Sequence, residues 1–152
     1  MSIRNNIEKQ YKQSILEKKS DLTNTLRLIK SAIKDKDIEV RSSGIKNGIE
    51  DKEILKLFQN LAKQRKDSID SFQKAGRKDL VEKEEIELNI INSFLPNQKN
   101  EEETESIIMN LIKENNYNSI KDMGNLMNIL KEGYSGQIDM GLAGKIAKLN
   151  LS

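Results

Sequence analysis

The chain of 152 residues carries 26 Lys and Arg against 24 Asp and Glu, a net charge of +2, and it contains neither Cys nor His. The absence of Cys excludes disulfides, iron–sulfur clusters, thiolate zinc sites and a cysteine nucleophile. The absence of His excludes imidazole metal ligands and Ser-His-Asp triads. What remains is carboxylate or lysine chemistry, a carboxylate Mg²⁺ site, or no catalysis. We expect no catalytic residue, no metal and no cofactor.

The composition is typical of an all-α protein. Charged residues make up 33% of the chain and aromatic residues 4%, and there is a single Pro, whereas sandwiches and barrels need many aromatic and turn-forming residues. No apolar run approaches the roughly 20 residues of a membrane span, so no membrane contact is expected. The N-terminal residues lack the apolar core of a secretory signal, and we therefore expect a cytoplasmic protein.

Four amphipathic helices are predicted in the first part of the chain, at about 3–18, 22–41, 51–74 and 80–94. In each segment apolar residues recur every three or four positions, which places them on one face of a helix. Helices of this spacing pack as a stack of hairpins or as a bundle. The apolar stripe of the first helix consists of Ile3, Ile7, Tyr11, Ile15 and Leu16.

Polar residues and a glycine predict where these helices begin and end. Ser20 or Asp21 can cap the second helix, and Asp79 can cap the fourth, because a short polar side chain accepts hydrogen bonds from the free amides of the first turn. Gly76 follows the third helix, where a left-handed residue commonly ends a helix.

The boundary at Leu95-Pro96 is the clearest in the chain, because it contains the only Pro and a helix interior excludes Pro. The net charge also changes sign there, from +4 over residues 1–95 to −2 over residues 96–152. We therefore predict an all-α N-terminal domain of about four helices over 1–95, followed by a small three-helix tail domain over 96–152.

The three tail helices are each preceded by a residue that can cap a helix. Asn100 precedes a helix with acidic residues in its first turn that runs to about residue 115, and acidic residues suit the positive end of a helix dipole. Ser119 precedes a helix to about residue 132, and Asp139 precedes one that ends near residue 149.

Two charged clusters are candidates for function. The run Lys63-Gln64-Arg65-Lys66 could contact phosphates, although each Lys also precedes an Asp by four residues and could pair with it. Glu84 and Glu87 share a helix face and could hold Mg²⁺ or form an acid/base pair. Alternatively, the two carboxylates form a solvated face, or ion pairs with Lys63, Arg65 or Arg77 across a helix contact.

Three further features allow more than one interpretation. Arg27, Lys30 and Lys34 lie on neighbouring faces of the second helix. The glycines after residue 132 match no phosphate-loop motif and favour a structural role. The run Lys121-Asp122-Met123-Gly124 opens a helix, where Met123 fills a small core or the turn presents free amides to a phosphate.

Several of these runs together resemble the YqeY-like family over essentially the whole chain. The matching segments are Leu26–Ile33, Lys63–Phe72, Ala75–Leu80, Glu84 and Glu87, Leu95-Pro96 and Lys121–Gly124. That family is similar to the C-terminal region of the B subunit of the tRNA-dependent amidotransferase. The resemblance implies an all-helical domain followed by a three-helix tail.

The resemblance also implies a connection to tRNA. It favours a tRNA-binding adaptor that is not catalytic by itself, with Lys63, Arg65, Arg77 and Lys121 as phosphate contacts. One alternative is an accessory component that works with amidotransferase subunits, for which the family label is carbon–nitrogen ligase with glutamine as amido-N-donor. The other is a module that binds a different protein and no RNA.

One segment departs from the family pattern. Relatives often carry a basic residue between Gly136 and Asp139, where this chain has Gln137-Ile138. If that loop contacts a phosphate in relatives, we expect a weaker contact in this chain.

Overall fold

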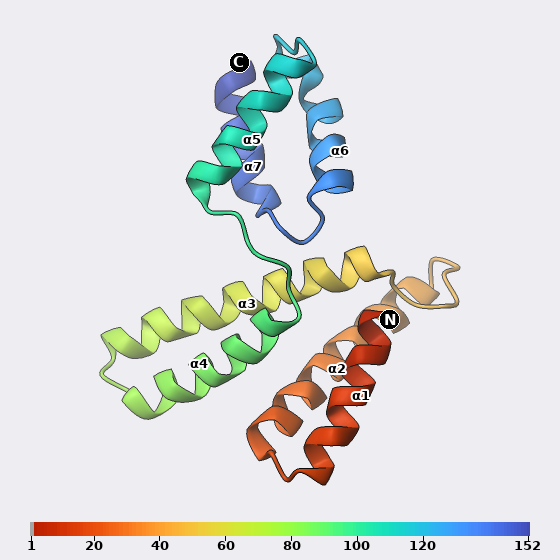
Figure 1. The fold of residues 1–152 in the computed structure, drawn as a ribbon, viewed down its shortest axis with the longest axis vertical. Helices are drawn as coiled ribbons and strands as arrows, with labels where there is room; N and C mark the ends of the chain where they lie inside the picture. The colour runs from red at the N-terminus through yellow and green to blue at the C-terminus, as the bar shows by residue number, and fades with distance from the viewer. Residues whose placement is uncertain (1) are drawn as a thin grey trace. The chain divides into compact units, whose positions relative to one another are not determined.

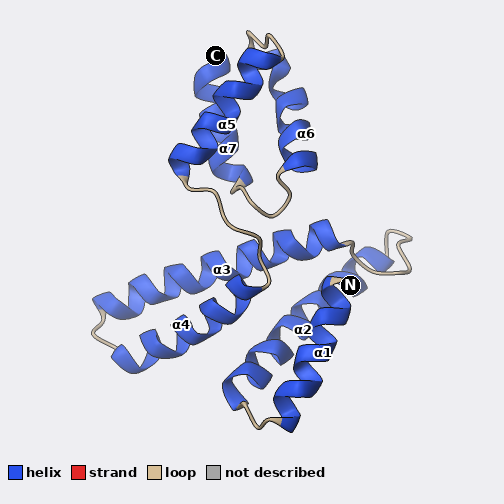
Figure 2. Cartoon of the chain, viewed as in Figure 1, coloured by secondary structure: helices blue, strands red, loops and turns tan. Residues whose placement is uncertain are grey.

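The computed structural model describes residues 2–152, and over this range every regular element is helical. Figure 2 shows helices joined by loops, without strands in the described part of the chain. The all-α prediction is confirmed. The elements, labelled as in Figure 1, are α1 (Ile3–Leu16), α2 (Ser20–Arg41), α3 (Asp51–Lys74), α4 (Lys78–Ser93), α5 (Glu101–Glu114), the 3₁₀ turn η1 (Ile120–Asp122), α6 (Met123–Gly133) and α7 (Met140–Leu151).

Contacts between Cα atoms divide the chain into two compact units, Met1–Leu95 and Pro96–Ser152. Helices α1 to α4 lie in the first unit, and α5 to α7 lie in the second. That the two units are domains of four and three helices stays a prediction.

The first unit consists of two helical hairpins, α1–α2 and α3–α4, in which the paired helices run antiparallel (Figure 1). Phe58 of α3 is fully buried, and its ring meets Phe94 edge to face with the ring centroids 5.8 Å apart, a favoured geometry for two aromatic rings. Burial of one apolar stripe per helix fixes the arrangement. The buried core residues are Ile7, Leu26, Ile29, Ile33, Ile49, Ile54, Phe58, Ala62 and Ile91.

The stripe predicted for α1 is only partly correct. Ile7 is buried, but Ile15 is 50% exposed and Leu16 is 82% exposed. The inward position near the end of α1 belongs to Ser14, whose hydroxyl lies 2.7 Å from the Thr23 hydroxyl of α2 and donates to a backbone carbonyl of its own helix. The apolar contact therefore stops one turn before the helix ends.

The predicted starts of α2 and α4 were wrong. Helix α2 begins at Ser20 after Lys19, and α4 begins at Lys78 after Arg77; neither preceding residue forms a side-chain cap hydrogen bond. Asp79 lies in the first turn of α4. The positive end of the helix dipole stabilises its negative charge there. The expectation for Gly76 is confirmed, because its φ of +70° is left-handed.

The second unit follows the predicted caps closely. Asn100 forms a full capping box with Glu103 at the start of α5, and the Asp139 carboxylate accepts from two amides of α7. Ser119 caps η1 rather than α6 directly. A core forms between the three helices from Ile108, Leu126, Leu130, Ile138, Ala143, Ile146, Ala147 and Leu151.

The segment Gln137-Ile138 has a structural role in this unit. Ile138 is fully buried, and the Gln137 carbonyl accepts a hydrogen bond of 2.7 Å from the Lys99 amide. Gly136 precedes them with a φ of +74°, a conformation that glycine adopts without steric cost. Position 138 therefore belongs to the core of the second unit and is closed to an outside phosphate.

Candidate nucleic-acid interface

Arg65, one of the predicted phosphate contacts, lies between α3 and α4. Its Nε donates to Glu87 Oε2 at 2.7 Å and lies 3.4 Å from Glu84 Oε2. The three side chains are only 13–20% exposed. Of the alternatives for Glu84 and Glu87, the structure contains the ion pairs with Arg65 across a helix contact. The Arg65 charge is therefore already compensated.

Glu84 Oε2 is buried and has no hydrogen-bond partner among the described residues. The nearby Arg65 guanidinium compensates its charge, because an ion pair persists at distances slightly beyond a hydrogen bond. Removing Arg65 would leave two half-buried carboxylates facing each other. The cluster is therefore a structural joint that depends on one cation.

The other predicted contacts lie apart from Arg65. Arg77, at the turn between α3 and α4, pairs with Asp79 at 3.2 Å, and this pair lowers the pKa of the Asp79 carboxyl. Lys63 is exposed on α3, and Lys121 is exposed in η1 of the second unit. Across residues 2–152 neither lysine forms an ion pair, so both ammonium groups are available to a ligand.

The positive charge of the first unit is concentrated on one hairpin. Residues 2–41, which hold α1 and α2, contain ten basic and six acidic side chains, a net charge of +4. Residues 51–93, which hold α3 and α4, contain nine of each and are neutral. The whole excess of residues 1–95 therefore belongs to the α1–α2 hairpin, where an anionic partner would be attracted.

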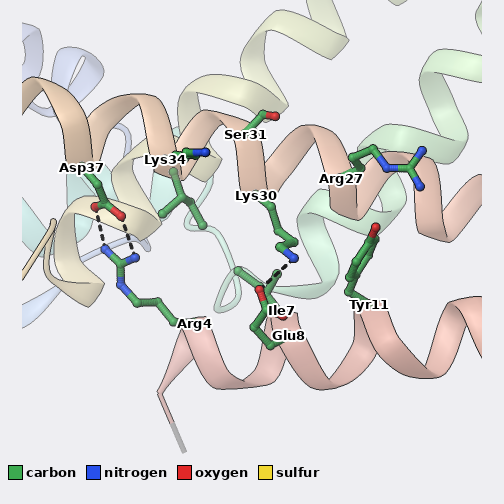
Figure 3. Close-up of a pocket in the computed structure, with 10 residues that line it drawn as sticks. Arg4, Ile7, Glu8, Tyr11, Arg27, Lys30, Ser31, Lys34 and Asp37 are labelled. Atoms are coloured by element: carbon green, nitrogen blue, oxygen red, sulfur yellow. Dashed lines mark hydrogen bonds and ion pairs between the residues drawn. The ribbon is translucent and has the colours of Figure 1, made fainter.

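A groove of about 380 Å³ runs between α1 and α2 (Figure 3). Its polar lining comprises four basic and two acidic side chains, so the groove itself carries a net positive charge. Ile7 and Tyr11 of α1 and Ile33 of α2 also line the groove. The ten lining residues are Arg4, Ile7, Glu8, Tyr11, Arg27, Lys30, Ser31, Ile33, Lys34 and Asp37.

One end of the groove is closed by a clamp formed by Arg4, Asp37 and Ile49. The Arg4 guanidinium donates to both carboxylate oxygens of Asp37, at 2.7 and 2.8 Å, and to the Ile49 carbonyl at 2.9 Å. The Ile49 amide donates to the same carboxylate at 2.8 Å. The Arg4 hydrogen bonds hold the pKa of the Asp37 carboxyl below its usual range.

Gly48 is required beside this clamp. Its φ is +81°, and a Cβ at this position would lie 2.5 Å from Asp37 Oδ1 and 2.8 Å from Arg4 Nη2. The left-handed backbone disfavours any other residue, and a Cβ would push the Asp37 and Arg4 side chains out of the clamp. The clamp therefore fixes the loop between α2 and α3 and is not free to bind an outside ligand.

Further along the groove, Lys30 pairs with Glu8 at 2.9 Å and places its ammonium 4.1 Å from the centroid of the Tyr11 ring. These contacts hold the lysine above one face of the aromatic ring, as a cation–π pair. Figure 3 shows Tyr11 and Lys30 facing each other across the groove, with the hydroxyl end of the ring toward Arg27.

After these pairings, Arg27 and Lys34 remain as uncompensated cations of the groove. Arg27 makes one long hydrogen bond of 3.4 Å to the neutral Asn24 side chain, and within the described part of the chain neither residue has an ion-pair partner. They are seven residues apart on α2, about 10 Å along the helix axis. Two cations at this spacing can meet two different phosphates.

The sequence indicated these residues only in part. Arg27, Lys30 and Lys34 stood out as basic positions on one helix, but no pattern in a single sequence tells which of their charges a neighbouring helix neutralises. The net charge of each hairpin was the available signal. It separates α1–α2 from α3–α4 without any structural information.

The described residues offer neither a metal site nor a membrane span. Residues 2–152 contain no group of three or more Asp and Glu side chains placed to hold a metal ion. In the same range, no helix has the length and apolar character needed to cross a bilayer.

Comparison with curated proteins finds relatives in yeasts. The chain is 36% identical over 90 residues to altered inheritance of mitochondria protein 41, mitochondrial, of Lachancea thermotolerans, and 34% identical over 89 residues to the protein of that name from Vanderwaltozyma polyspora. Each match covers 59% of this chain and 46% of the relative. An uncharacterized protein of Schizosaccharomyces pombe is 32% identical over 90 residues, 59% of this chain and 69% of that protein. The chain thus spans about half the length of the first relatives.

These relatives correct the expected location. Four of them are named as mitochondrial proteins, and the cytoplasmic prediction was wrong by this comparison. The prediction was based only on the absence of a secretory signal. An apolar core marks secretory signal peptides, whereas mitochondrial transit peptides are amphipathic and rich in Arg, so the absence of an apolar core does not distinguish cytoplasm from mitochondrion.

The family comparison covers nearly the whole chain. The model of the Yqey-like protein family matches residues 4–151, which include both compact units and the segments on which the resemblance was based. The chain belongs to the YqeY-like family.

Proposed function

We propose that this protein is a non-catalytic RNA-binding adaptor, with tRNA as the class of RNA and the α1–α2 groove as its main contact surface. The observation that supports this most is the pair Arg27 and Lys34, two uncompensated cations on a hairpin of net charge +4. Phosphate contacts release counterions and supply most of the affinity in RNA binding. Two free cations in a groove are therefore worth more than several that are already paired.

The four phosphate contacts predicted from the sequence are not equally available to RNA. Lys63 and Lys121 have free ammonium groups and remain phosphate contacts in it. Arg65 and Arg77 are engaged with carboxylates, and a phosphate would have to displace those partners. In this proposal α1–α4 form a domain that binds the RNA backbone, and α5–α7 form a tail domain with Lys121 as a secondary contact.

Fluorescence anisotropy with labelled tRNA tests this function. The wild type is compared with Arg27→Gln/Lys34→Gln at several salt concentrations. Because each lost phosphate contact removes about 0.7 to 0.9 from the slope of log affinity against log salt, the double variant should flatten that slope by about 1.5. A comparison variant, Lys63→Gln/Lys66→Gln, removes the same charge from exposed positions on α3, where only Lys63 is a proposed contact, so the slope should flatten by about half as much.

The outcomes separate the candidate surfaces. The groove is supported as the main contact if Arg27→Gln/Lys34→Gln flattens the salt slope of tRNA affinity more than Lys63→Gln/Lys66→Gln does. The reverse result would move the interface to Lys63 and its neighbours. Absence of wild-type binding to any tRNA, at low as well as physiological salt, contradicts the proposed function.

A second candidate is a module that docks on another protein, such as an amidotransferase subunit. The exposed apolar residues at the turn between α1 and α2 favour it, because Leu16 is 82% and Ile15 50% exposed, and exposed apolar groups often mark protein contacts. Co-purification of amidotransferase subunits with the wild type, and their loss with Ile15→Ser/Leu16→Ser, would support this role.

A further inference from the structure

The α1–α2 groove combines three features that a plain phosphate-binding surface does not need. It is hollowed to about 380 Å³, it contains an aromatic ring, and its free cations Arg27 and Lys34 lie on either side of Lys30, which covers that ring (Figure 3). Concave sites of a few hundred Å³ hold small molecules or single chemical groups. A flat basic helix face would be sufficient to bind a duplex backbone.

Tyr11 is the aromatic residue of this groove. The Lys30 ammonium lies over one face of its ring, 4.1 Å from the centroid. Lys30 also pairs with Glu8, and these two side chains are 33% and 49% exposed. A base can take the place of the Lys30 ammonium on this face, because an exposed ion pair contributes little, and Arg27 lies near the hydroxyl end of the ring (Figure 3).

We infer that the groove binds one unpaired nucleotide of the RNA, with its base stacked on Tyr11 and its flanking phosphates on Arg27 and Lys34. This inference rests on the proposed function and names the kind of RNA structure that the site selects. Proteins that read unpaired RNA stack splayed bases on aromatic rings and follow the backbone with basic residues. A base inside a duplex cannot reach the ring without leaving its stack.

The groove therefore prefers RNA loops to paired stems. The preference arises because a duplex offers only its phosphates to Arg27 and Lys34, whereas a loop adds the stacking contact with Tyr11. Removal of one base–aromatic contact lowers affinity by about 5- to 150-fold. The discrimination between loop and duplex should fall in that range.

Two RNAs of equal length and charge test the inference, a hairpin with an unpaired loop and a fully paired duplex. The wild type should bind the hairpin at least about fivefold more tightly than the duplex. Tyr11→Leu keeps an apolar side chain against the core but removes stacking, and should abolish this preference. Tyr11→Phe keeps the ring and should retain the preference for the hairpin. Tyr117→Leu removes a half-buried aromatic residue from the second unit and serves as the matched control.

A fluorescent base reports the stacking directly. 2-Aminopurine in the loop should lose fluorescence on binding to the wild type and to Tyr11→Phe, but not on binding to Tyr11→Leu. The same base in the paired stem should respond to none of them. Circular dichroism melts of Tyr11→Leu establish that the variant is folded at the assay temperature.

The results distinguish failure of this inference from failure of the proposed function. Equal binding of hairpin and duplex, still weakened by Arg27→Gln/Lys34→Gln, overturns the stacked nucleotide but leaves the RNA-binding surface intact. Absence of binding to both RNAs overturns the function itself. Competition by micromolar adenosine monophosphate would assign the groove to free nucleotides and overturn the inference as well.

Discussion

The two hairpins of the first unit use similar residues for different purposes. Helices α3 and α4 carry nine basic and nine acidic side chains, and Arg65 forms a joint with two glutamates between them. Helices α1 and α2 carry a net charge of +4 and leave Arg27 and Lys34 without an ion-pair partner in the described structure. The density of basic residues along the sequence is greatest on α3, yet the net positive charge lies on the α1–α2 hairpin. The comparison teaches that charge must be counted after pairing.

The largest test of this contrast replaces one arginine in each hairpin. Arg65→Met should lower the free energy of unfolding by about 3 kcal/mol, because it leaves two half-buried carboxylates without their cation. Arg27→Met should change it by less than about 0.5 kcal/mol, as expected for a surface position. Urea titration of both variants measures the difference. Equal effects would break the distinction between a structural and an available arginine.

The next effect concerns the loop that joins the hairpins. Gly48→Ala should cost about 2–3 kcal/mol, from the left-handed backbone and from the clash with Asp37 and Arg4. Gly44→Ala is the matched control, because its φ is +91° but its Cβ would meet nothing within 4 Å, so only the backbone cost of about 1 kcal/mol applies. Thermal melts should separate the two variants by several degrees.

Much of the helical framework followed from the sequence, and the exceptions have physical reasons. Gly76 and the Asn100 capping box were predictable because each depends on a few neighbouring residues. The exposure of Leu16 and the burial of Ser14 depend instead on where α2 crosses α1. The same holds for Arg65, whose partner Glu87 is 22 residues away. Periodicity identifies a helix face but not the register between two helices.

A smaller effect is expected from the clamp on the α1–α2 hairpin. Asp37→Asn should cost about 1–3 kcal/mol at neutral pH through loss of a charged hydrogen-bond acceptor. Because Arg4 lowers the pKa of Asp37 in the folded state, the stabilisation is complete above the ordinary carboxyl pKa and is lost as the pH falls through the lower folded value. The free energies of unfolding of the wild type and of Asp37→Asn should therefore converge in acid. A difference that stays constant down to the lowest pH would contradict this assignment.

The smallest effect belongs to the exposed pair in the groove. Lys30→Gln removes the ion pair with Glu8 and the cation over Tyr11, and should cost about 0.5–1 kcal/mol. At high salt the difference in unfolding free energy between Lys30→Gln and the wild type should become much smaller, because salt screens exposed ion pairs. If the loss instead approached that of Arg65→Met, the two hairpins would not differ in how they use their ion pairs.

The clamp also makes the Ile49 amide a reporter of local opening. This N–H belongs to a loop, yet it donates to a carboxylate that is itself held by the first turn of α1. Its hydrogen exchange should therefore be slow for a loop amide and should follow the opening of α1, not the motions of its immediate neighbours. One amide signal thus monitors whether the beginning of the chain is docked.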